Sequence, residues 1–207
     1  MWGPHFHYED AAMLSGTVRV AGVDEVGRGP LAGPVTSAAV VLDPDNIPFG
    51  INDSKKLTPK KREDLFDVLL DVADVSVAHA SVEEVDRLNI LQASFLAMRR
   101  AVNGLSDGPG LVLVDGAQIP PDLSCEARSI VKGDTISLSI AAASIIAKVT
   151  RDRIMWDLAQ QFPGYGWETN AGYGSKSHMA ALETLGATPH HRRSFKPVHN
   201  ILYQVKT

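Results

Sequence analysis

The segment that most constrains the fold is residues 22–34, which read Gly-Val-Asp-Glu-Val-Gly-Arg-Gly-Pro-Leu-Ala-Gly-Pro. An apolar run over residues 18–23 leads directly into two adjacent carboxylates, Asp24 and Glu25. Like charges this close repel each other unless a cation compensates them. Mg²⁺ is a hard cation that takes carboxylate and phosphate oxygens as ligands. The segment therefore predicts a strand that ends at a divalent-metal site.

The glycines on either side of Arg28 indicate that a ligand approaches the backbone closely. Gly27 and Gly29 carry no Cβ, so a bulky group can reach the main chain at both positions. Together with the preceding acids, Gly27, Arg28 and Gly29 predict a binding site for a phosphate or a sugar beside the metal.

Apolar runs and turn residues divide the rest of the chain into strands and helices. Neither of the first two strands alternates cleanly between apolar and polar residues, so we expect both faces of the sheet to be covered. Strands that are first antiparallel and then alternate with helices predict an α/β fold with a mixed sheet. We expect strands at 18–24, 35–42, 75–80, 111–115 and 125–131, and helices at 59–72, 89–103, about 135–162 (capped by Asp134 or Thr135) and 177–185.

Two more acids fit the same metal site by their context. Asp115 ends an apolar strand and is followed by Gly116. Asp152 lies on the long helix, whose small residues at 141–147 allow close packing on the sheet. It can reach the ends of the first and fourth strands if those strands are neighbours. Each acid alone is an ordinary turn or surface residue, and it is their joint occurrence that favours a metal site.

Composition indicates the class of protein. The chain has 207 residues, of which 44% are apolar, and one cysteine, Cys125. This is enough for a buried core in one domain, and the absence of an internal disulfide is typical of the reducing cytoplasm. There is neither a membrane-length apolar run nor a signal-peptide pattern. We therefore expect a cytoplasmic protein that does not span a membrane.

The distribution of charge favours a polyanionic ligand, although the net charge of −4 argues mildly against one. Five of the eight residues at 55–62 are basic, and residues 176–207 contain five Lys or Arg and one acid. Most such runs are solvated surface, but here two of them flank a carboxylate cluster. Lysines at such positions position a nucleic acid without reading its sequence. The candidate phosphate contacts are Lys55, Lys56, Lys132 and Lys176.

Other catalytic motifs fit less well. Gly27, Gly29 and Gly33 lack the spacing of a dinucleotide-binding loop, and a strand rather than a helix is expected after them. The sequence contains no Walker A loop and no Gly-x-Ser-x-Gly elbow. The C-terminal histidines lack regular zinc-ligand spacing.

Several longer motifs occur in order along the chain and resemble those of one family. They are residues 22–34, Asp-Ser-Lys-Lys-Leu (53–57), Val-Asp-Gly (114–116), Lys-Gly-Asp (132–134), residues 139–152, Gly-Tyr-Gly (172–174) and His-Arg-Arg-Ser-Phe (191–195). Together they resemble type 2 ribonuclease H, specifically bacterial ribonuclease HII, over about residues 18–198. The resemblance implies an RNase H-like mixed sheet of about five strands flanked by helices. It also implies a single catalytic domain, with a core at about 16–160 and a helical C-terminal extension at about 161–207.

The resemblance also implies roles for individual residues. It implies that Gly27, Arg28 and Gly29 sense the ribose 2′-hydroxyl and that Tyr173 stacks on the neighbouring sugar. The 2′-hydroxyl is the chemical handle that distinguishes RNA from DNA at one site. Residues 1–15 lie outside the resemblance and receive no role. The implied metal-binding and catalytic residues are Asp24, Glu25, Asp115 and Asp152.

The implied activity is endonucleolytic cleavage of the RNA strand in RNA–DNA hybrids, including single ribonucleotides embedded in duplex DNA, as in ribonucleotide excision repair. We predict hydrolysis with two Mg²⁺ or Mn²⁺ ions that leaves 5′-phosphate and 3′-hydroxyl ends. We expect a monomer, and no C-terminal motif supports contact with a sliding clamp.

Two alternative functions stay open. One is another RNase H-like nuclease that acts on DNA, such as an integrase or a resolvase, and cleavage of an all-DNA duplex would favour it. The other is a non-catalytic nucleic-acid-binding module, which hybrid binding insensitive to a chelator would favour.

Overall fold

The computed structural model describes residues 3–203 of the chain. A five-stranded sheet in the order β3-β2-β1-β4-β5 forms its middle layer. Its pairs β1–β2 and β2–β3 are antiparallel, and β1–β4 and β4–β5 are parallel. This confirms the mixed sheet expected from the sequence, and it makes the first and fourth strands neighbours. The strands are β1 (Val20–Val26), β2 (Val35–Val41), β3 (Asp74–Ala80), β4 (Leu111–Asp115) and β5 (Glu126–Ile130).

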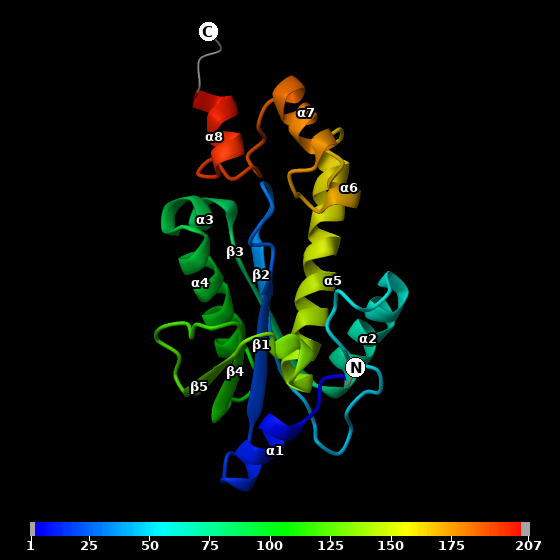
Figure 1. The fold of residues 1–207 in the computed structure, drawn as a ribbon, viewed down its shortest axis with the longest axis vertical. Coiled ribbons are helices and arrows are strands. Elements are labelled where there is room, and N and C mark those ends of the chain that lie inside the picture. The colour runs from blue at the N-terminus through cyan, green and yellow to red at the C-terminus, as the bar shows by residue number, and fades with distance from the viewer. Residues whose placement is uncertain (1–2, 204–207) are drawn as a thin grey trace.

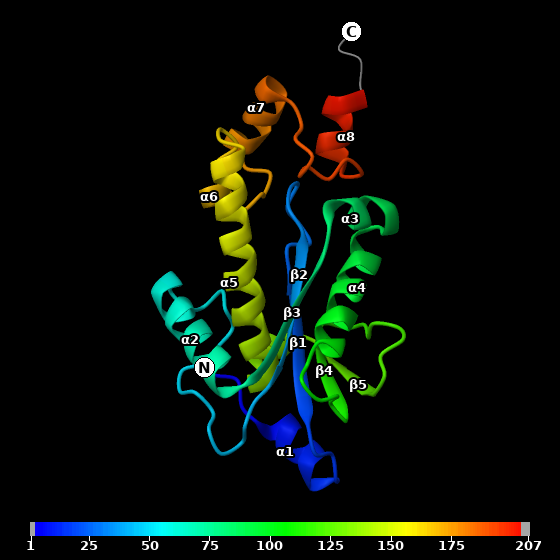
Figure 2. The same cartoon turned by 180° about the vertical axis from the view of Figure 1, so that it is seen from behind.

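Helices cover both faces of this sheet (Figure 1). The long helix α5 lies along one face with α2 outside it, and α4 lies on the opposite face, as the reverse view also shows (Figure 2). The C-terminal helices α6, α7 and α8 gather near the far end of α5. The helices are α1 (His7–Leu14), α2 (Pro59–Val72), α3 (Val82–Leu88), α4 (Ile90–Asn103), α5 (Leu138–Gln161), α6 (Trp167–Asn170), α7 (Lys176–Leu185) and α8 (Lys196–Tyr203), with a 3-10 turn η1 (Gly133–Thr135).

Small residues let α5 touch the backbone of the central strand. A Cβ added to Gly22 of β1 would lie 2.1 Å from the carbonyl carbon of Ser139. The alanines at 141–143 and Ala147 on α5 are fully buried in the core on this face. Close packing of the long helix on the sheet, which the sequence predicted from its small residues, is therefore confirmed.

Two details of the predicted elements were wrong. The first strand does not end at Asp24, because antiparallel pairing with β2 continues to the Val26–Thr36 pair. The long helix begins at Leu138 with Ser137 as its N-cap, because the Ser137 hydroxyl accepts a hydrogen bond from the Ile140 amide. Asp134 belongs instead to η1, where it is buried.

The N-terminal residues, to which the sequence assigned no role, hold the start of α5. The carboxylate of Glu9, fully buried, accepts hydrogen bonds from the Ser137 hydroxyl at 2.6 Å and from the Ser139 amide at 3.0 Å. The His5 amide donates to the Ile136 carbonyl at 2.9 Å. A negative charge at a helix N-terminus is favourable, so α1 stabilises the helix that carries Asp152. Across residues 3–203, no helix combines the length and the apolar character needed to cross a membrane.

Candidate active site

Strand register brings two of the predicted acids side by side. The parallel pairing of β1 with β4 ends at the Val23–Val114 pair, so Asp24 and Asp115 are the next residues on neighbouring strands. Residues at matched positions of adjacent strands point to the same face. Here that face is the one covered by α5. Glu25 alternates to the α4 face, so the acids lie on both sides of the sheet end.

The Asp24 carboxyl is buried among other negative charges. It is 7% exposed, and one of its oxygens accepts a hydrogen bond from the Glu25 amide at 2.7 Å. Burial raises the pKa of Asp24 well above its usual range, and the charges of Glu25, Asp115 and Asp134 raise it further. The site therefore concentrates negative charge that the protein itself does not fully neutralise.

The pKa values of Glu25 and Asp115 are also raised, although less than that of Asp24. Burial raises the pKa of Glu25, and Arg28, whose guanidinium lies 3.1 Å from the Glu25 carboxylate, partly offsets this. Burial and then the charge of Asp134 raise the pKa of Asp115, while the Gly133 amide, at 2.7 Å, stabilises the ionised form.

Asp134 is an additional acid that the sequence interpretation missed. It is 6% exposed, and its charge acts on both Asp24 and Asp115. Its signal was present in the Lys-Gly-Asp motif at 132–134, but the residue was interpreted as a helix cap. The turn η1 instead places its carboxylate beside β4.

Lys55 supplies a positive charge next to this cluster. Its ammonium lies 3.4 Å from the Asp134 carboxylate. Burial alone would lower the pKa of Lys55, but Asp134, Asp24 and Asp53 raise it. A hydrogen bond from the Ser54 amide to the Ser144 hydroxyl, 3.2 Å long, ties this turn to α5. One of the four predicted lysines therefore lies at the acids.

The structure does not join the Asp152 carboxylate to the other acids. Asp152 accepts a hydrogen bond from Lys148 at 2.6 Å, one turn earlier on α5. The charges with the largest effect on Asp24 and Asp115 come from other residues. Within residues 3–203, no three His, Cys, Asp or Glu side chains already stand close enough to hold a metal ion.

The chemistry of the acids fits a hard divalent cation nonetheless. Mg²⁺ and Mn²⁺ take carboxylate oxygens, and burial, together with neighbouring carboxylates, raises the pKa of Asp24, Glu25 and Asp115. A bound cation would compensate these charges. The carboxylates would first have to turn from their present hydrogen bonds.

The glycine-rich loop between β1 and β2, residues 27–34, packs tightly against buried side chains. Gly27 has a positive φ of 95°, and a Cβ there would lie 2.3 Å from Nε of Arg151. A Cβ on Gly29 would lie 3.2 Å from Cε1 of Tyr173, so the tyrosine ring covers that glycine. The structure thus brings Gly27, Gly29 and Tyr173 together at the end of β1, and Arg28 pairs with Glu25 there.

The other three lysines are exposed. Lys132 stands two residues before Asp134, and Lys176 opens α7 three residues after Tyr173. Lys56 follows Lys55 in the turn that reaches the acids.

A groove beside the acids has an apolar wall. A cavity of about 280 Å³ is lined by the residues Glu25 and Asp115 at the strand ends and by Leu91, Phe95 and Met98 of α4. The three residues recur at helical spacing in the sequence, but that pattern does not distinguish a groove wall from core. Leu91 and Phe95 therefore escaped notice as candidate site residues.

Comparisons with known proteins identify the family of this chain. Residues 21–198 match the family model described as Ribonuclease HII. Ribonuclease HII from Roseobacter denitrificans is 66% identical over 194 residues, which cover 94% of this chain and 98% of the relative. The crystal structure of ribonuclease H2 from Pyrococcus horikoshii superposes with a TM-score of 0.74 at 32% identity, covering 89% of this chain and 97% of that one. The RNase HII of the PCNA:RNase HII complex from Archaeoglobus fulgidus gives a TM-score of 0.74 at 26% identity, with 86% and 96% covered.

Proposed function

The chain belongs to the ribonuclease HII family, and on that basis we propose that it cleaves duplex DNA at a single embedded ribonucleotide. It is a metal-dependent hydrolase of ribonuclease H type 2 and an endoribonuclease that acts on RNA–DNA hybrids. Its recognition of an isolated ribonucleotide requires a contact with one sugar, because the 2′-hydroxyl is what marks it.

The apposition of Tyr173 and Gly29 is the observation that supports this substrate. The tyrosine ring lies against the backbone of Gly29, and the acids Asp24 and Glu25 precede this loop by a few residues. A sugar stacked on the ring lies within reach of the loop backbone and of the acids at once. In this proposal Gly27, Arg28 and Gly29 contact the 2′-hydroxyl and Tyr173 stacks on the adjacent sugar.

We assign metal binding and catalysis to Asp24, Glu25, Asp115 and Asp152. The first three already influence one another's ionisation. Asp152 follows Arg151, whose guanidinium packs against Gly27, and it must leave Lys148 to take part. When Mg²⁺ or Mn²⁺ is bound, it supplies Lewis-acid activation of water and stabilisation of the leaving oxygen, which gives 5′-phosphate and 3′-hydroxyl ends.

The chain's own residues bind and orient the duplex. Exposed lysines on both sides of the acids meet the phosphates, and the apolar α4 wall of the groove excludes water beside Asp115. The lysines that take this role are Lys55, Lys56, Lys132 and Lys176.

We further propose a single catalytic domain that works as a cytoplasmic monomer in ribonucleotide excision repair. Residues 161–207 extend the core at 16–160 in this proposal. The Archaeoglobus fulgidus relative assembles with PCNA. For the present chain, sliding-clamp contact stays a prediction without a supporting motif, and residues 204–207 lie outside the described residues.

A cleavage assay with three duplexes tests the proposal. One duplex carries a single ribonucleotide, the second contains a continuous RNA strand opposite DNA, and the third is all DNA. We expect metal-dependent nicking at the ribonucleotide, cleavage of the hybrid, and an intact all-DNA duplex. Equal cutting of all-DNA duplex would favour the integrase or resolvase alternative. Tight hybrid binding with no cleavage in Mg²⁺ or Mn²⁺ would favour a binding module.

A further inference from the structure

Arg192 is fully buried, and every N–H of its guanidinium donates a hydrogen bond to the glycine-rich loop. Its guanidinium makes five hydrogen bonds of 2.6–3.1 Å to the carbonyls of Gly27, Arg28, Pro30 and Gly33. An arginine has five N–H donors, so none is left for another ligand. Among residues 3–203, no carboxylate forms an ion pair with it. Burial and then the charge of Arg151 lower the pKa of Arg192 to about 9, and the charge of Asp86 partly offsets this.

These bonds determine where the following amides point. In a trans peptide the carbonyl and the next N–H point in opposite directions, and the described chain has no cis bond. The carbonyls of Gly27 and Arg28 face Arg192, so the amides of Arg28 and Gly29 face away from it. Within the described part of the chain, neither amide has a hydrogen-bond acceptor.

The other two carbonyls on Arg192 leave no free amide. The amide after Pro30 belongs to Leu31 and donates to the Gly172 carbonyl at 2.8 Å. The residue after Gly33 is Pro34, which has no N–H. The arrangement therefore frees two adjacent donors, those of Arg28 and Gly29, beside the ring of Tyr173.

A second buried arginine provides a contrast. Arg151 donates to the carbonyls of Ala32, Pro34 and Ala171 at 2.9–3.0 Å. The amides that follow two of these carbonyls are already satisfied: Gly33 donates to the His190 carbonyl and Gly172 to the Asn170 side chain. The third precedes Val35, the first residue of β2. Arg151 stabilises the same loop without presenting a free donor.

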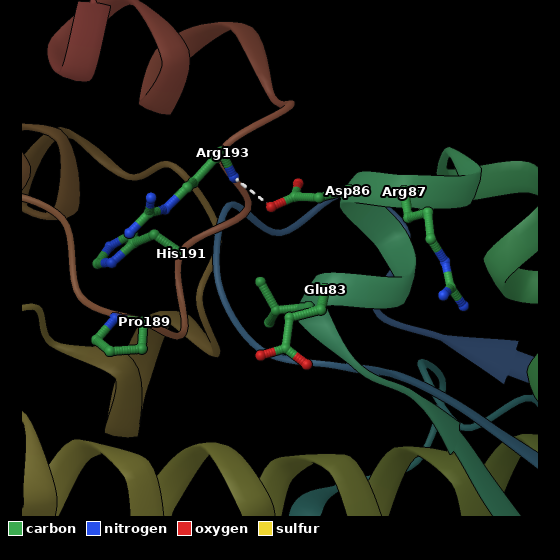
Figure 3. Close-up of a pocket in the computed structure, with 7 residues that line it drawn as sticks. Glu83, Asp86, Arg87, Pro189, His191 and Arg193 are labelled. Atoms are coloured by element: carbon green, nitrogen blue, oxygen red, sulfur yellow. Dashed lines mark hydrogen bonds between the residues drawn. The ribbon is translucent and has the colours of Figure 1, made fainter.

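The segment that carries Arg192 is held from both sides. Its amide donates to the Leu31 carbonyl at 2.8 Å. Figure 3 shows the next residue, Arg193, whose amide donates to Asp86 of α3 at 3.0 Å. The Ser194 amide and hydroxyl also donate to Asp86, at 2.9 and 2.6 Å. These hydrogen bonds hold the backbone at Arg192 in place, so its guanidinium is held at a fixed position relative to the loop.

We propose that Arg192 is a positioning residue that presents the amides of Arg28 and Gly29 as a paired donor site for the ribose 2′-oxygen. This inference rests on the proposed function, since it specifies how that site distinguishes a ribonucleotide from a deoxyribonucleotide. Arg192 itself touches no substrate. Its contribution is to turn two peptide units so that their donors need no reorientation when the sugar arrives.

The test measures discrimination without relying on turnover. Binding of two duplexes, identical except for one ribonucleotide or deoxyribonucleotide, is measured by fluorescence anisotropy in EDTA. The amide resonances of Arg28 and Gly29 are followed by NMR in the same titrations. The variants are Arg192→Lys, which keeps the charge but not the fork, the buried control Arg151→Lys, and the exposed control Arg193→Gln.

For the wild type, we expect tighter binding of the ribonucleotide duplex and shifts of both amides that the deoxyribonucleotide duplex does not cause. Arg192→Lys should reduce this preference about tenfold, the size of one to two hydrogen bonds, and remove the difference in shifts. Arg151→Lys should lower thermal stability yet keep the preference. Arg193→Gln, at an exposed position outside the loop, should also keep the preference.

The outcomes distinguish a failure of the proposed function from a failure of the positioning role of Arg192. If wild-type protein neither cleaves nor prefers the ribonucleotide duplex, the proposed function fails. If the wild type prefers it and Arg192→Lys, shown to be folded by its melting curve, keeps the full preference, the role of Arg192 is wrong and the proposed function stands. Equal losses in Arg192→Lys and Arg151→Lys would also overturn the positioning role, because they would show a general effect of loop stability.

Discussion

The ring of Tyr173 lies over the backbone of Gly29, so that a Cβ on the glycine would be 3.2 Å from Cε1 of the ring. The tyrosine remains 49% exposed. Gly29 follows β1 and Tyr173 precedes α7, so two segments that are far apart in the sequence form one small surface. The remaining exposed face of the ring is free for a sugar in the proposed complex.

Gly29→Ala tests this surface directly. The backbone at Gly29 does not adopt a positive φ, so alanine is tolerated locally, but its methyl group displaces the ring by a few tenths of an ångström. We expect a several-fold rise in KM for the single-ribonucleotide duplex with little change in melting temperature. Tyr173→Ala should cost about tenfold or more in kcat/KM, since stacking on a nucleotide is worth about 1–3 kcal/mol. Gly108→Ala is the matched control because its Cβ would meet nothing within 4 Å. Unchanged kinetics in Gly29→Ala would contradict the stacking role.

Asp24→Asn and Asp115→Asn test the acid cluster. Each removes a charge that stabilises a divalent metal by several kcal/mol, so cleavage should fall roughly hundredfold or more. Stability in chelator should stay equal or rise, because the amide removes the cost of burying a charge and the repulsion from neighbouring acids, both of which raise the pKa of these carboxyls. Cleavage kinetics and urea unfolding in EDTA measure the two effects. Asp157→Asn, exposed on α5, is the control. Near wild-type turnover by either site variant at saturating Mg²⁺ would refute the assignment.

Lys55→Met should strengthen binding of a divalent metal to the free protein. The Lys55 ammonium now partly neutralises Asp134 and Asp24, so its removal leaves more negative charge for Mn²⁺ to compensate. We expect about a two- to fivefold lower Kd, since exposed pairs contribute about 1 kcal/mol or less. Titration calorimetry with Mn²⁺ alone measures it, with the exposed neighbour Lys56→Met as the comparison. Weaker metal binding in Lys55→Met would show that the lysine does not compete for the acids.

Acid should destabilise the protein through His191. Burial, followed by the charges of His178 and His190, lowers the pKa of His191 from 6.5 to about 4. Its Nδ1 accepts hydrogen bonds from the Thr188 amide and hydroxyl, so its neutral form is the one that the fold satisfies. Because the unfolded chain takes up the proton first, this contribution is complete above pH 6.5 and is lost as the pH falls towards 4.

Urea unfolding at pH 7 and pH 5 measures this effect as a difference between proteins. His191 should contribute about 2 kcal/mol of lost stability between the two values, at about 1.4 kcal/mol per pH unit below its unfolded pKa. His191→Gln should lack that contribution, whereas His199→Gln, at an exposed position, should retain the wild-type pH dependence. Equal pH dependence in wild type and His191→Gln would contradict the assignment.

Glu9→Gln should destabilise the fold even though residue 9 precedes every recognised motif. The substitution removes the negative charge that accepts hydrogen bonds from Ser137 and Ser139 at the start of α5. We expect a loss of about 1–3 kcal/mol, the range for a buried hydrogen bond to a charged group. Asp10→Asn, at the exposed neighbouring acid, should change little. Equal stability of the two variants in urea would show that α1 does not support α5.

The pattern along the chain was sufficient for the sheet and the main helices, and it placed three acids near the strand ends. Asp24, Glu25 and Asp115 follow Val-rich runs, and such runs predict the strands, although β1 continues to Val26 because it pairs with β2. The alanine-rich part of α5 likewise predicted close packing on the sheet, because the size of a side chain is known before its partner is.

The roles of Asp134, Arg192 and Leu91 depended on tertiary structure. Asp134 resembled a helix cap, Arg192 a solvated basic residue, and Leu91 part of an apolar helix face. Each acquired its role from a segment distant in the sequence: β4 for the acid, the glycine-rich loop for the arginine, and the ends of β1 and β4 for the leucine.

The sequence by itself therefore determined which residues can carry charge, bend the backbone or pack closely, since these are properties of single side chains and their immediate neighbours. The tertiary structure decided which charges are buried together and which carbonyls face a guanidinium. Burial and through-space electrostatics depend on chain segments that meet only after folding, and no local pattern specifies those meetings.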